Sequence, residues 1–204
     1  MDRQEYLNQI SMKNQPAKKS KSGIFASKFF WIGAIGVAVF ILIMIVGSAL
    51  GGGSTSVKDK IFGLILHIDN TFELVGKYQP DVKSSDLRSY SASLSGILLD
   101  TSRSLTSYAT EKYNFKANDV KEEITEEETV AKDGLDTELF EAKINGNLDR
   151  IYAHKMTYEI SMITTREAQI IKSVNNDILK EALIKSYDSL DVLYSKFNDF
   201  SETK

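Results

Sequence analysis

The stretch Val57–Tyr78, VKDKIFGLILHIDNTFELVGKY, decides the fold expected for this chain. Its apolar residues recur in steps of four and three, at Ile61, Ile65, Ile68, Phe72 and Val75. That spacing places them on one face of an α-helix, so the stretch predicts an amphipathic helix that packs against other helices. Pro80 ends the helix, because proline disfavours helical geometry in the residue before it.

A second helix with the same spacing is expected after this proline. Ser84 or Ser85 can cap its first turn, where Asp86 is also favourable. Its stripe consists of small and apolar side chains: Leu87, Ser91, Leu94, Leu98, Thr101, Leu105 and Tyr108. The residues from Tyr113 to Asp119 read as a connection.

Three more helices are expected in the remaining sequence. A short acidic helix over 119–132 is broken at Gly134. A long helix then runs from about residue 136 to 174, with apolar positions at Phe140, Ile144, Leu148, Ile151, Tyr152, Met156, Ile160, Ile163 and Ile170. A last helix, to about Phe200, carries the stripe Leu179, Leu183, Tyr187, Leu190, Tyr194 and Phe197. Four long amphipathic helices predict an all-α, antiparallel, four-helix-bundle-like domain over 57–204.

Upstream of this domain lies an uncharged apolar stretch, Phe29–Leu50, FFWIGAIGVAVFILIMIVGSAL. At about 1.5 Å per residue it spans ~33 Å, enough to cross a bilayer as a transmembrane helix. A cleaved secretion signal with Gly47 and Ala49 before the cut is an alternative, although its apolar core usually runs roughly 7–15 residues. A pilin-like leader cut after Gly23 is disfavoured, because Lys28 stands where such subunits carry glutamate.

The charges on the two sides of the apolar stretch predict its orientation. Before it, the basic residues are Arg3, Lys13, Lys18, Lys19, Lys21 and Lys28, against Asp2 and Glu5. A lysine-rich flank stays cytoplasmic. We therefore expect a basic cytoplasmic tail (1–28), a membrane anchor (29–50), the Gly/Ser tether GGGSTS (51–56) and an extracytoplasmic domain. With 19 Lys and Arg against 26 Asp and Glu after the anchor, the domain is acidic, which argues against nucleic acid as a partner.

Small residues in the anchor permit close approach of two membrane helices. Ala34 and Ala38 lie four residues apart, as do Gly47 and Gly51. This spacing permits a homo-oligomer formed through the transmembrane helix, but it is more often found in membrane helices that do not pair, where such residues are common.

The residue pattern indicates no catalytic, cofactor or metal site. The chain contains no cysteine, which removes disulfides, thiolate nucleophiles and cysteine-ligated zinc. Neither His67 nor His154 has a carboxylate three or four residues away, the spacing that a metal site on one helix needs. Each histidine is expected at the edge of the bundle, and only a site built across helices would bring ligands to either one. No nucleophile-elbow motif exists.

The acidic run 119–128, DVKEEITEEE, is the best candidate for an electrostatic contact. As a solvated helix face it would have no specific role; as a site it would contact a basic partner surface or a hard cation. The candidate partner residues are Glu122, Glu123, Glu126, Glu127 and Glu128. The tyrosines Tyr152, Tyr158, Tyr187 and Tyr194 are an alternative binding face, or core residues with hydrated hydroxyls.

Three runs carry a resemblance to known proteins: LHIDNTFELVGKYQPDVKSSDLRSYSASL (66–94), TEKYNFK (110–116) and AKINGNLDRIYAHKMTYEISM (142–162). Together with the lysine-flanked anchor they resemble single-pass helical proteins of small-genome, Saccharibacteria-type bacteria. No activity is attached to that group, and the resemblance transfers no site residue. Because such cells live attached to a bacterial host, it implies that an outward-facing domain contacts host or envelope material.

These features favour a non-enzymatic, membrane-tethered interaction module that binds an envelope component, a partner protein or a host surface. A sensor domain is the first alternative, and it would need a separate cytoplasmic partner, since only 28 residues precede the anchor. A metal-dependent enzyme is the second alternative.

Overall fold

The computed structural model describes residues 56–116 and 120–203. This part is all-helical and contains no strand. Its long helices are α3 (Val57–Tyr78), α4 (Ser85–Tyr113), α5 (Glu122–Ile144), α6 (Leu148–Ser173) and α7 (Asp177–Thr203), and the short 3-10 turn η2 (Gln79–Asp81) follows α3. The prediction of an all-α domain is thereby confirmed for the described residues.

The predicted tail, the anchor 29–50 and the tether up to Thr55 lie outside the described residues. Within 56–116 and 120–203, no helix is both long enough and apolar enough to cross a bilayer.

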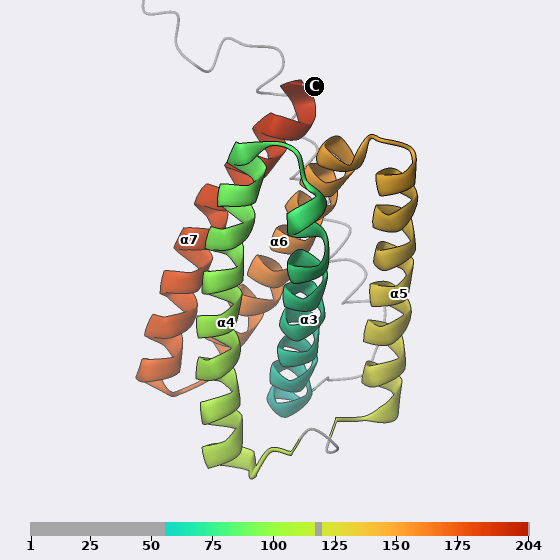
Figure 1. Cartoon of the computed structure of the whole chain (residues 1–204). Coiled ribbons are helices and arrows are strands. Elements are labelled where there is room, and N and C mark those ends of the chain that lie inside the picture. The colour runs from blue at the N-terminus through green and yellow to red at the C-terminus, as the bar shows by residue number, and fades with distance from the viewer. Residues whose placement is uncertain (1–55, 117–119, 204) are drawn as a thin grey trace, which may run out of the picture. The chain divides into compact units, whose positions relative to one another are not determined.

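Four of the long helices contact one another in a closed ring, and the fifth packs on the outside of this ring. α3 packs against α4, α4 against α7, α7 against α6, and α6 against α3. α5 lies outside this ring and contacts α3 and α6. Consecutive helices run in opposite directions, so α5 runs parallel to α3 (Figure 1).

Polar side chains fix several helix starts, and of the two caps predicted for α4 the structure has Ser84. The hydroxyl of Ser56 accepts a hydrogen bond from the backbone N–H of Asp59, and that of Ser84 accepts one from Leu87. The side chain of Asn176 caps α7 through Leu179. Each cap satisfies a backbone donor that would otherwise lack a partner in the first helical turn.

The predicted break at Gly134 is wrong, because α5 continues through this residue. The chain turns instead at Asn145–Asn147, where Gly146 has φ +74°. The backbone N–H of Gly146 bonds to the carbonyl of Lys143, and that of Asn147 bonds to Ala142. Glycine inside a helix costs only about 1 kcal/mol, whereas a positive φ favours glycine strongly, so the turn forms where the second condition holds.

The core stripes follow the predicted spacing, but four large residues expected in them are exposed: Phe72, Phe140, Ile144 and Tyr187. Smaller side chains take the neighbouring inward positions. Thr71 is buried in place of Phe72, and Ser186 in place of Tyr187. The Thr71 hydroxyl donates to the carbonyl of His67 one turn earlier at 2.8 Å, and it also lies 3.4 Å from Oε2 of Glu159 on α6.

Candidate functional site

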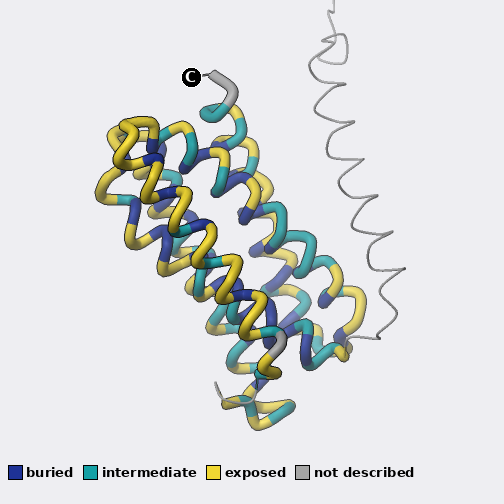
Figure 2. The backbone as a smooth tube through the Cα atoms, turned by 90° about the vertical axis from the view of Figure 1, so that its right-hand side faces the viewer, coloured by how far each residue is buried: buried dark blue, intermediate teal, exposed yellow. Residues whose placement is uncertain are grey.

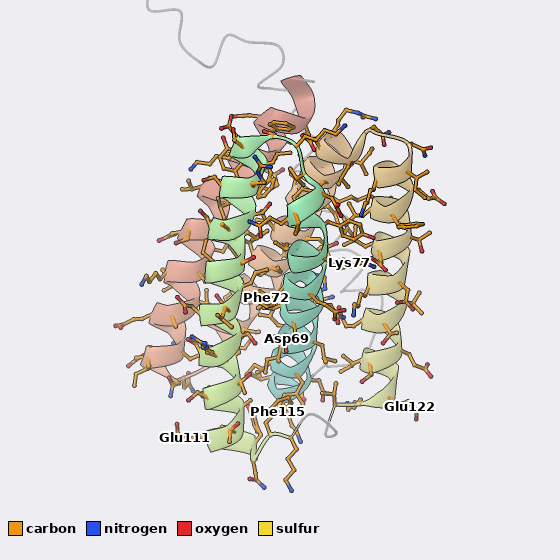
Figure 3. All side chains as sticks on the ribbon, viewed as in Figure 1. Asp69, Phe72, Lys77, Glu111, Phe115 and Glu122 are labelled. Atoms are coloured by element: carbon orange, nitrogen blue, oxygen red, sulfur yellow. The ribbon has the colours of Figure 1, made fainter. Side chains whose placement is uncertain are left out.

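Ion pairs join α5 and the residue before it to α3 and the turn after it. Three pairs connect the two helices, Glu128–His67, Lys132–Glu73 and Asp136–Lys77; Lys121–Asp59 lies at the residue just before α5, and Lys143–Asp81 reaches η2. Figure 3 shows Lys77 in the space between α3 and α5, where its Nζ lies 2.7 Å from Oδ1 of Asp136. The two partners of each pair are 59 to 62 residues apart in sequence, as a parallel pair of helices in constant register requires.

One of these pairs is buried and forms the centre of a larger cluster. Nδ1 of His67 lies 2.8 Å from Oε2 of Glu128, and Nε2 lies 3.1 Å from Oε2 of Glu159 on α6. The Nε2 contact lacks the geometry of a direct hydrogen bond and is an ion-pair contact only. Arg166 of α6 donates to Oε1 of Glu128 at 2.5 Å. The cluster thus links three helices.

The carboxylates and the arginine control the ionisation of the cluster. Burial is the largest single effect on His67 and lowers its pKa, but the contacts with Glu128 and Glu159 together outweigh burial, and the net pKa is raised. Burial likewise raises the pKa of Glu128, but His67 and Arg166 outweigh it and lower the net value. Both directions favour an imidazolium at His67 paired with an ionised Glu128.

A cavity of about 20 Å³ adjoins this cluster between α3, α5 and α6. His67, Thr71, Glu128 and Glu159 are among its lining residues. This volume accommodates one water molecule and excludes an organic substrate. Among the described residues, no group of three or more His, Asp or Glu side chains is arranged to hold a metal ion.

The outward side of α5 carries a second stripe, opposite to the one that packs on α3 and α6. We call it the outer stripe; its members recur in steps of three and four and are Glu122, Glu126, Val130, Asp133, Thr137, Phe140 and Ile144. Val130, Phe140 and Ile144 are 72%, 52% and 67% exposed. Figure 2, in which α5 faces the viewer, shows this side of the helix mostly exposed. The outer stripe is acidic near the start of α5 and apolar near its end.

The structure divides the predicted acidic contact residues. Glu122, Glu126 and Glu127 are exposed, and the side chain of Glu123 lies outside what is described. Glu128 is buried in the His67 cluster, so it cannot belong to an exposed partner surface as predicted. Its inward position follows from spacing that includes the buried residues of α5, since Leu135, Leu139 and Ala142 stand seven, eleven and fourteen residues later.

The expectation of an edge position is wrong for His67, which is 7% exposed, whereas His154 is exposed. Spacing within α3 does not reveal the carboxylates around His67, because these carboxylates belong to α5 and α6. The four tyrosines do not form one face: Tyr152 is buried and bonds to Ser91, while Tyr158 and Tyr187 are exposed and Tyr194 is half-buried.

A second buried carboxyl group lies on α6, facing α7 and α4. Glu167 is 0% exposed, and neither of its carboxyl oxygens has a hydrogen-bond partner in the described part of the chain. Burial raises the pKa of Glu167 to about 8, while the nearby Ser186 hydroxyl acts in the opposite direction. The Thr101 hydroxyl donates to Ser186 at 2.7 Å. Burial therefore favours the neutral, protonated form of Glu167 at pH 7.

Comparison of the chain with known protein families, with curated proteins and with solved structures found no match.

Proposed function

We propose that the chain is a membrane-tethered, extracytoplasmic, four-helix-bundle-like module whose added helix α5 binds a partner protein. The observation that supports this most is the outer stripe of α5. This stripe aligns three strongly exposed apolar side chains on one helix face: Val130, Phe140 and Ile144. A partner that covers them removes their unfavourable contact with water.

The charges of α5 indicate which partner surface fits. Glu122 and Glu126 precede the apolar part of the outer stripe, and Asp133 lies within it. A helix or strand with basic residues at one end and apolar residues at the other complements this order. A second copy of α5 laid antiparallel would instead bring carboxylates against each other's apolar ends, which disfavours self-association through this face.

The attachment of α5 supports a rigid presentation of this stripe. Its inward side is fixed by the ion pairs to α3, by Arg166 and by the ion pair between Glu138 and Lys155 of α6. A helix that is already ordered loses little conformational entropy when it binds. The bound partner can therefore use most of its contact energy for affinity.

Site-specific photo-crosslinking in the full-length protein tests the proposal. A photoreactive residue replaces Phe140 in one variant and Ile178, an exposed apolar residue on α7, in the control. We expect one defined cross-linked partner from position 140 and none from position 178, and purified partner should bind less tightly at high salt. Equal products from both positions, or none from position 140, would refute the role of the outer stripe.

The membrane topology has its own test. Protease added to intact cells should degrade the domain that follows the anchor while leaving a cytoplasmic control protein intact. Protection of the domain in intact cells, with cleavage only after lysis, would place it inside and contradict the extracytoplasmic assignment.

A sensor domain with a separate cytoplasmic partner is a second candidate, favoured by the buried His67 cluster. His67 touches carboxylates of two helices, so loss of its proton changes the attachment of α5. Full-length protein whose α5 amides show the same hydrogen-exchange protection at pH 6 and pH 8.5 would exclude this proton-linked form of sensing.

A further inference from the structure

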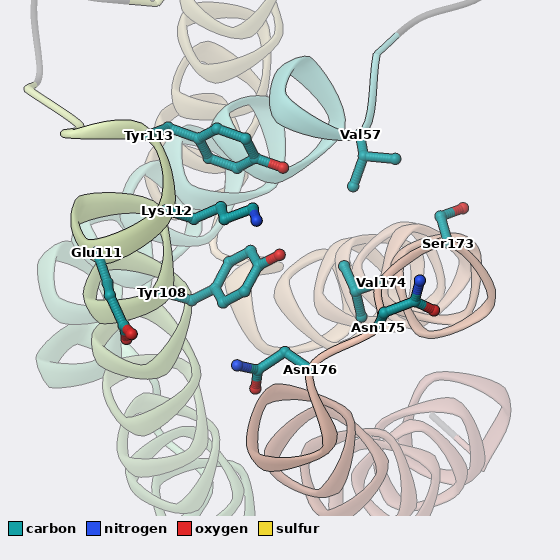
Figure 4. A pocket seen from close by; sticks show the side chains of 9 residues that line it. All are labelled: Val57, Tyr108, Glu111, Lys112, Tyr113, Ser173, Val174, Asn175 and Asn176. Atoms are coloured by element: carbon teal, nitrogen blue, oxygen red, sulfur yellow. The ribbon is translucent and has the colours of Figure 1, made fainter.

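A cleft lies at the end of the domain where α3 begins, α4 ends and α6 turns into α7. Its volume is about 440 Å³, within the range of roughly 300–1,000 Å³ found for small-ligand sites. Figure 4 shows Tyr108, Lys112 and Tyr113 of α4 on one side, with Asn175 and Asn176 of the α6–α7 turn across from them. The cleft is separate from α5 and from the outer stripe.

Hydrogen-bond donors line both sides of this cleft. The Lys112 amine extends between the hydroxyls of Tyr108 and Tyr113 (Figure 4), and it has no ion-pair partner among the described residues. Oδ1 of Asn176 already accepts from the backbone of Leu179, which leaves the amide N–H groups of this side chain as donors. Burial raises the pKa of Tyr113, with a further contribution from Tyr108, so its phenol keeps the proton that it can donate.

The local charge favours an anion in a domain that is otherwise acidic. The helix ends around the cleft, residues 56–60, 108–116 and 172–180, contain six lysines against three acidic residues. The acidic residues are Asp59, Glu111 and Asp177. Asp59 is paired with Lys121, and the Glu111 side chain extends along the wall away from the Lys112 amine (Figure 4).

We propose that this cleft binds a small ligand through a phosphate group. A phosphate accepts several hydrogen bonds from different directions, and here amine, phenol and amide donors approach from opposite walls. Lysine serves such ligands as a point charge, without the planar fork that matches a carboxylate. The ligand is either a soluble phosphate ester or the glycerophosphate headgroup of an anionic lipid, since both present the same group.

Isothermal titration calorimetry of the full-length protein in phosphatidylcholine nanodiscs tests the proposal, with glycerol 3-phosphate as the probe and glycerol as the uncharged comparison. We expect the wild type to bind glycerol 3-phosphate and not glycerol. Lys112→Met should weaken binding at least about 10-fold, the effect of losing one charge-assisted hydrogen bond. The matched control Lys185→Met, on the exposed side of α7, should bind like the wild type.

A second variant separates binding from folding. Tyr108→Phe keeps the ring and its contact with Tyr113 but removes the hydroxyl, and should weaken binding about 3- to 10-fold at unchanged helix content. Repeating the titration in phosphatidylglycerol nanodiscs distinguishes the ligand sources. Loss of the glycerol 3-phosphate signal there assigns the cleft to lipid headgroups, and an unchanged signal assigns it to a soluble phosphate ester.

Two results would overturn the proposal: no binding of glycerol 3-phosphate by the wild type at millimolar concentration, or equal affinities of the wild type and Lys112→Met. Neither result bears on cross-linking through the outer stripe, so this proposal and the proposed partner binding fail independently.

Discussion

Glu128 and Glu167 are both glutamates with almost no exposed surface, yet their pKa values are shifted in opposite directions. Glu128 contacts His67 and Arg166, and its pKa is lowered. Glu167 has no cation beside it, and burial raises its pKa to about 8. Burial alone therefore does not decide the charge of a carboxyl group; the partners that the fold supplies decide it.

The two sites also differ in what they join. The His67 cluster ties the added helix α5 to α3 and α6 through charges, whereas Glu167 sits with Ser186 and Thr101 where α6, α7 and α4 meet. Breaking a buried ion pair costs free energy, and so does ionising a buried acid that has no charged partner.

The largest effect is expected for Glu167→Gln at alkaline pH. In the wild type the folded state holds the Glu167 proton up to about pH 8, while the unfolded state releases it near pH 4.5. The free energy of unfolding should therefore fall as pH rises from 4.5 to 8, by up to about 5 kcal/mol. Glutamine cannot ionise, so the variant should lack this loss. Urea unfolding of the full-length protein in a mild detergent, followed by circular dichroism, measures it; equal pH profiles would contradict the assignment.

Glu128→Gln should destabilise the protein by about 3 kcal/mol at pH 7, because it removes the carboxylate that faces both His67 and Arg166 and leaves Glu159 beside His67 alone. The same urea titration measures this loss. Its matched control is Glu127→Gln, next to it in sequence and exposed, which should change stability by less than about 0.5 kcal/mol. If the two variants behave alike, the buried cluster contributes nothing specific.

A smaller, pH-dependent effect is expected from His67. Its folded pKa is raised, so the stabilisation is complete below the ordinary value of 6.5 and is lost as pH rises through the folded value. The loss is limited because Arg166 still neutralises Glu128. In the Glu167→Gln background, hydrogen-exchange protection of α5 should decline above pH 6.5, and His67→Gln should abolish the decline. A decline that persists without His67 would have another origin.

The smallest effect is expected for Ser186→Ala, which removes the acceptor of the Thr101 hydroxyl and the hydroxyl that opposes the pKa rise of Glu167. We expect about 1 kcal/mol of destabilisation in the urea titration. Ser195→Ala, whose hydroxyl bonds only to the carbonyl one turn earlier in its own helix, should be near neutral. Similar losses from both would show that the Ser186 contact across helices has no energetic role.

The spacing of apolar residues predicted the positions of most helices well, but the apolar pattern alone left out several polar residues that are buried. The limits of α3 and the starts of α4 and α7 follow from a proline, capping side chains and the four-three pattern, all of which act within a few residues. Glu167 lies four residues after Ile163 and three before Ile170, on the apolar stripe of α6, so spacing alone predicts its inward position. Spacing does not predict its lack of a partner, because that depends on what α4 and α7 place opposite.

The preference for bulky apolar residues caused the other errors. It placed Phe72 and Tyr187 in the core, although Thr71 and Ser186 lie there instead. Small hydroxyl residues find hydrogen-bond partners inside the bundle, Thr71 at the His67 carbonyl and Ser186 at the Thr101 hydroxyl, which a pattern of hydrophobicity does not record. In the acidic run, the spacing from Glu128 to Leu135, Leu139 and Ala142 separates Glu128 from its exposed neighbours, but treating the run as one patch does not. The cleft had no signal in the sequence, because four helix ends form it.

The packing of α5 against both α3 and α6 has a consequence for biosynthesis. During synthesis, α3 with Asp59, His67 and Lys77 becomes available for folding before α5 does, whereas Glu159 and Arg166 of α6 become available only after it. We expect Glu128 to remain hydrated until α6 follows, since the guanidinium of Arg166 that neutralises it is not yet within reach. In that interval only α3 would hold α5, and a folding helper would have time to act on it.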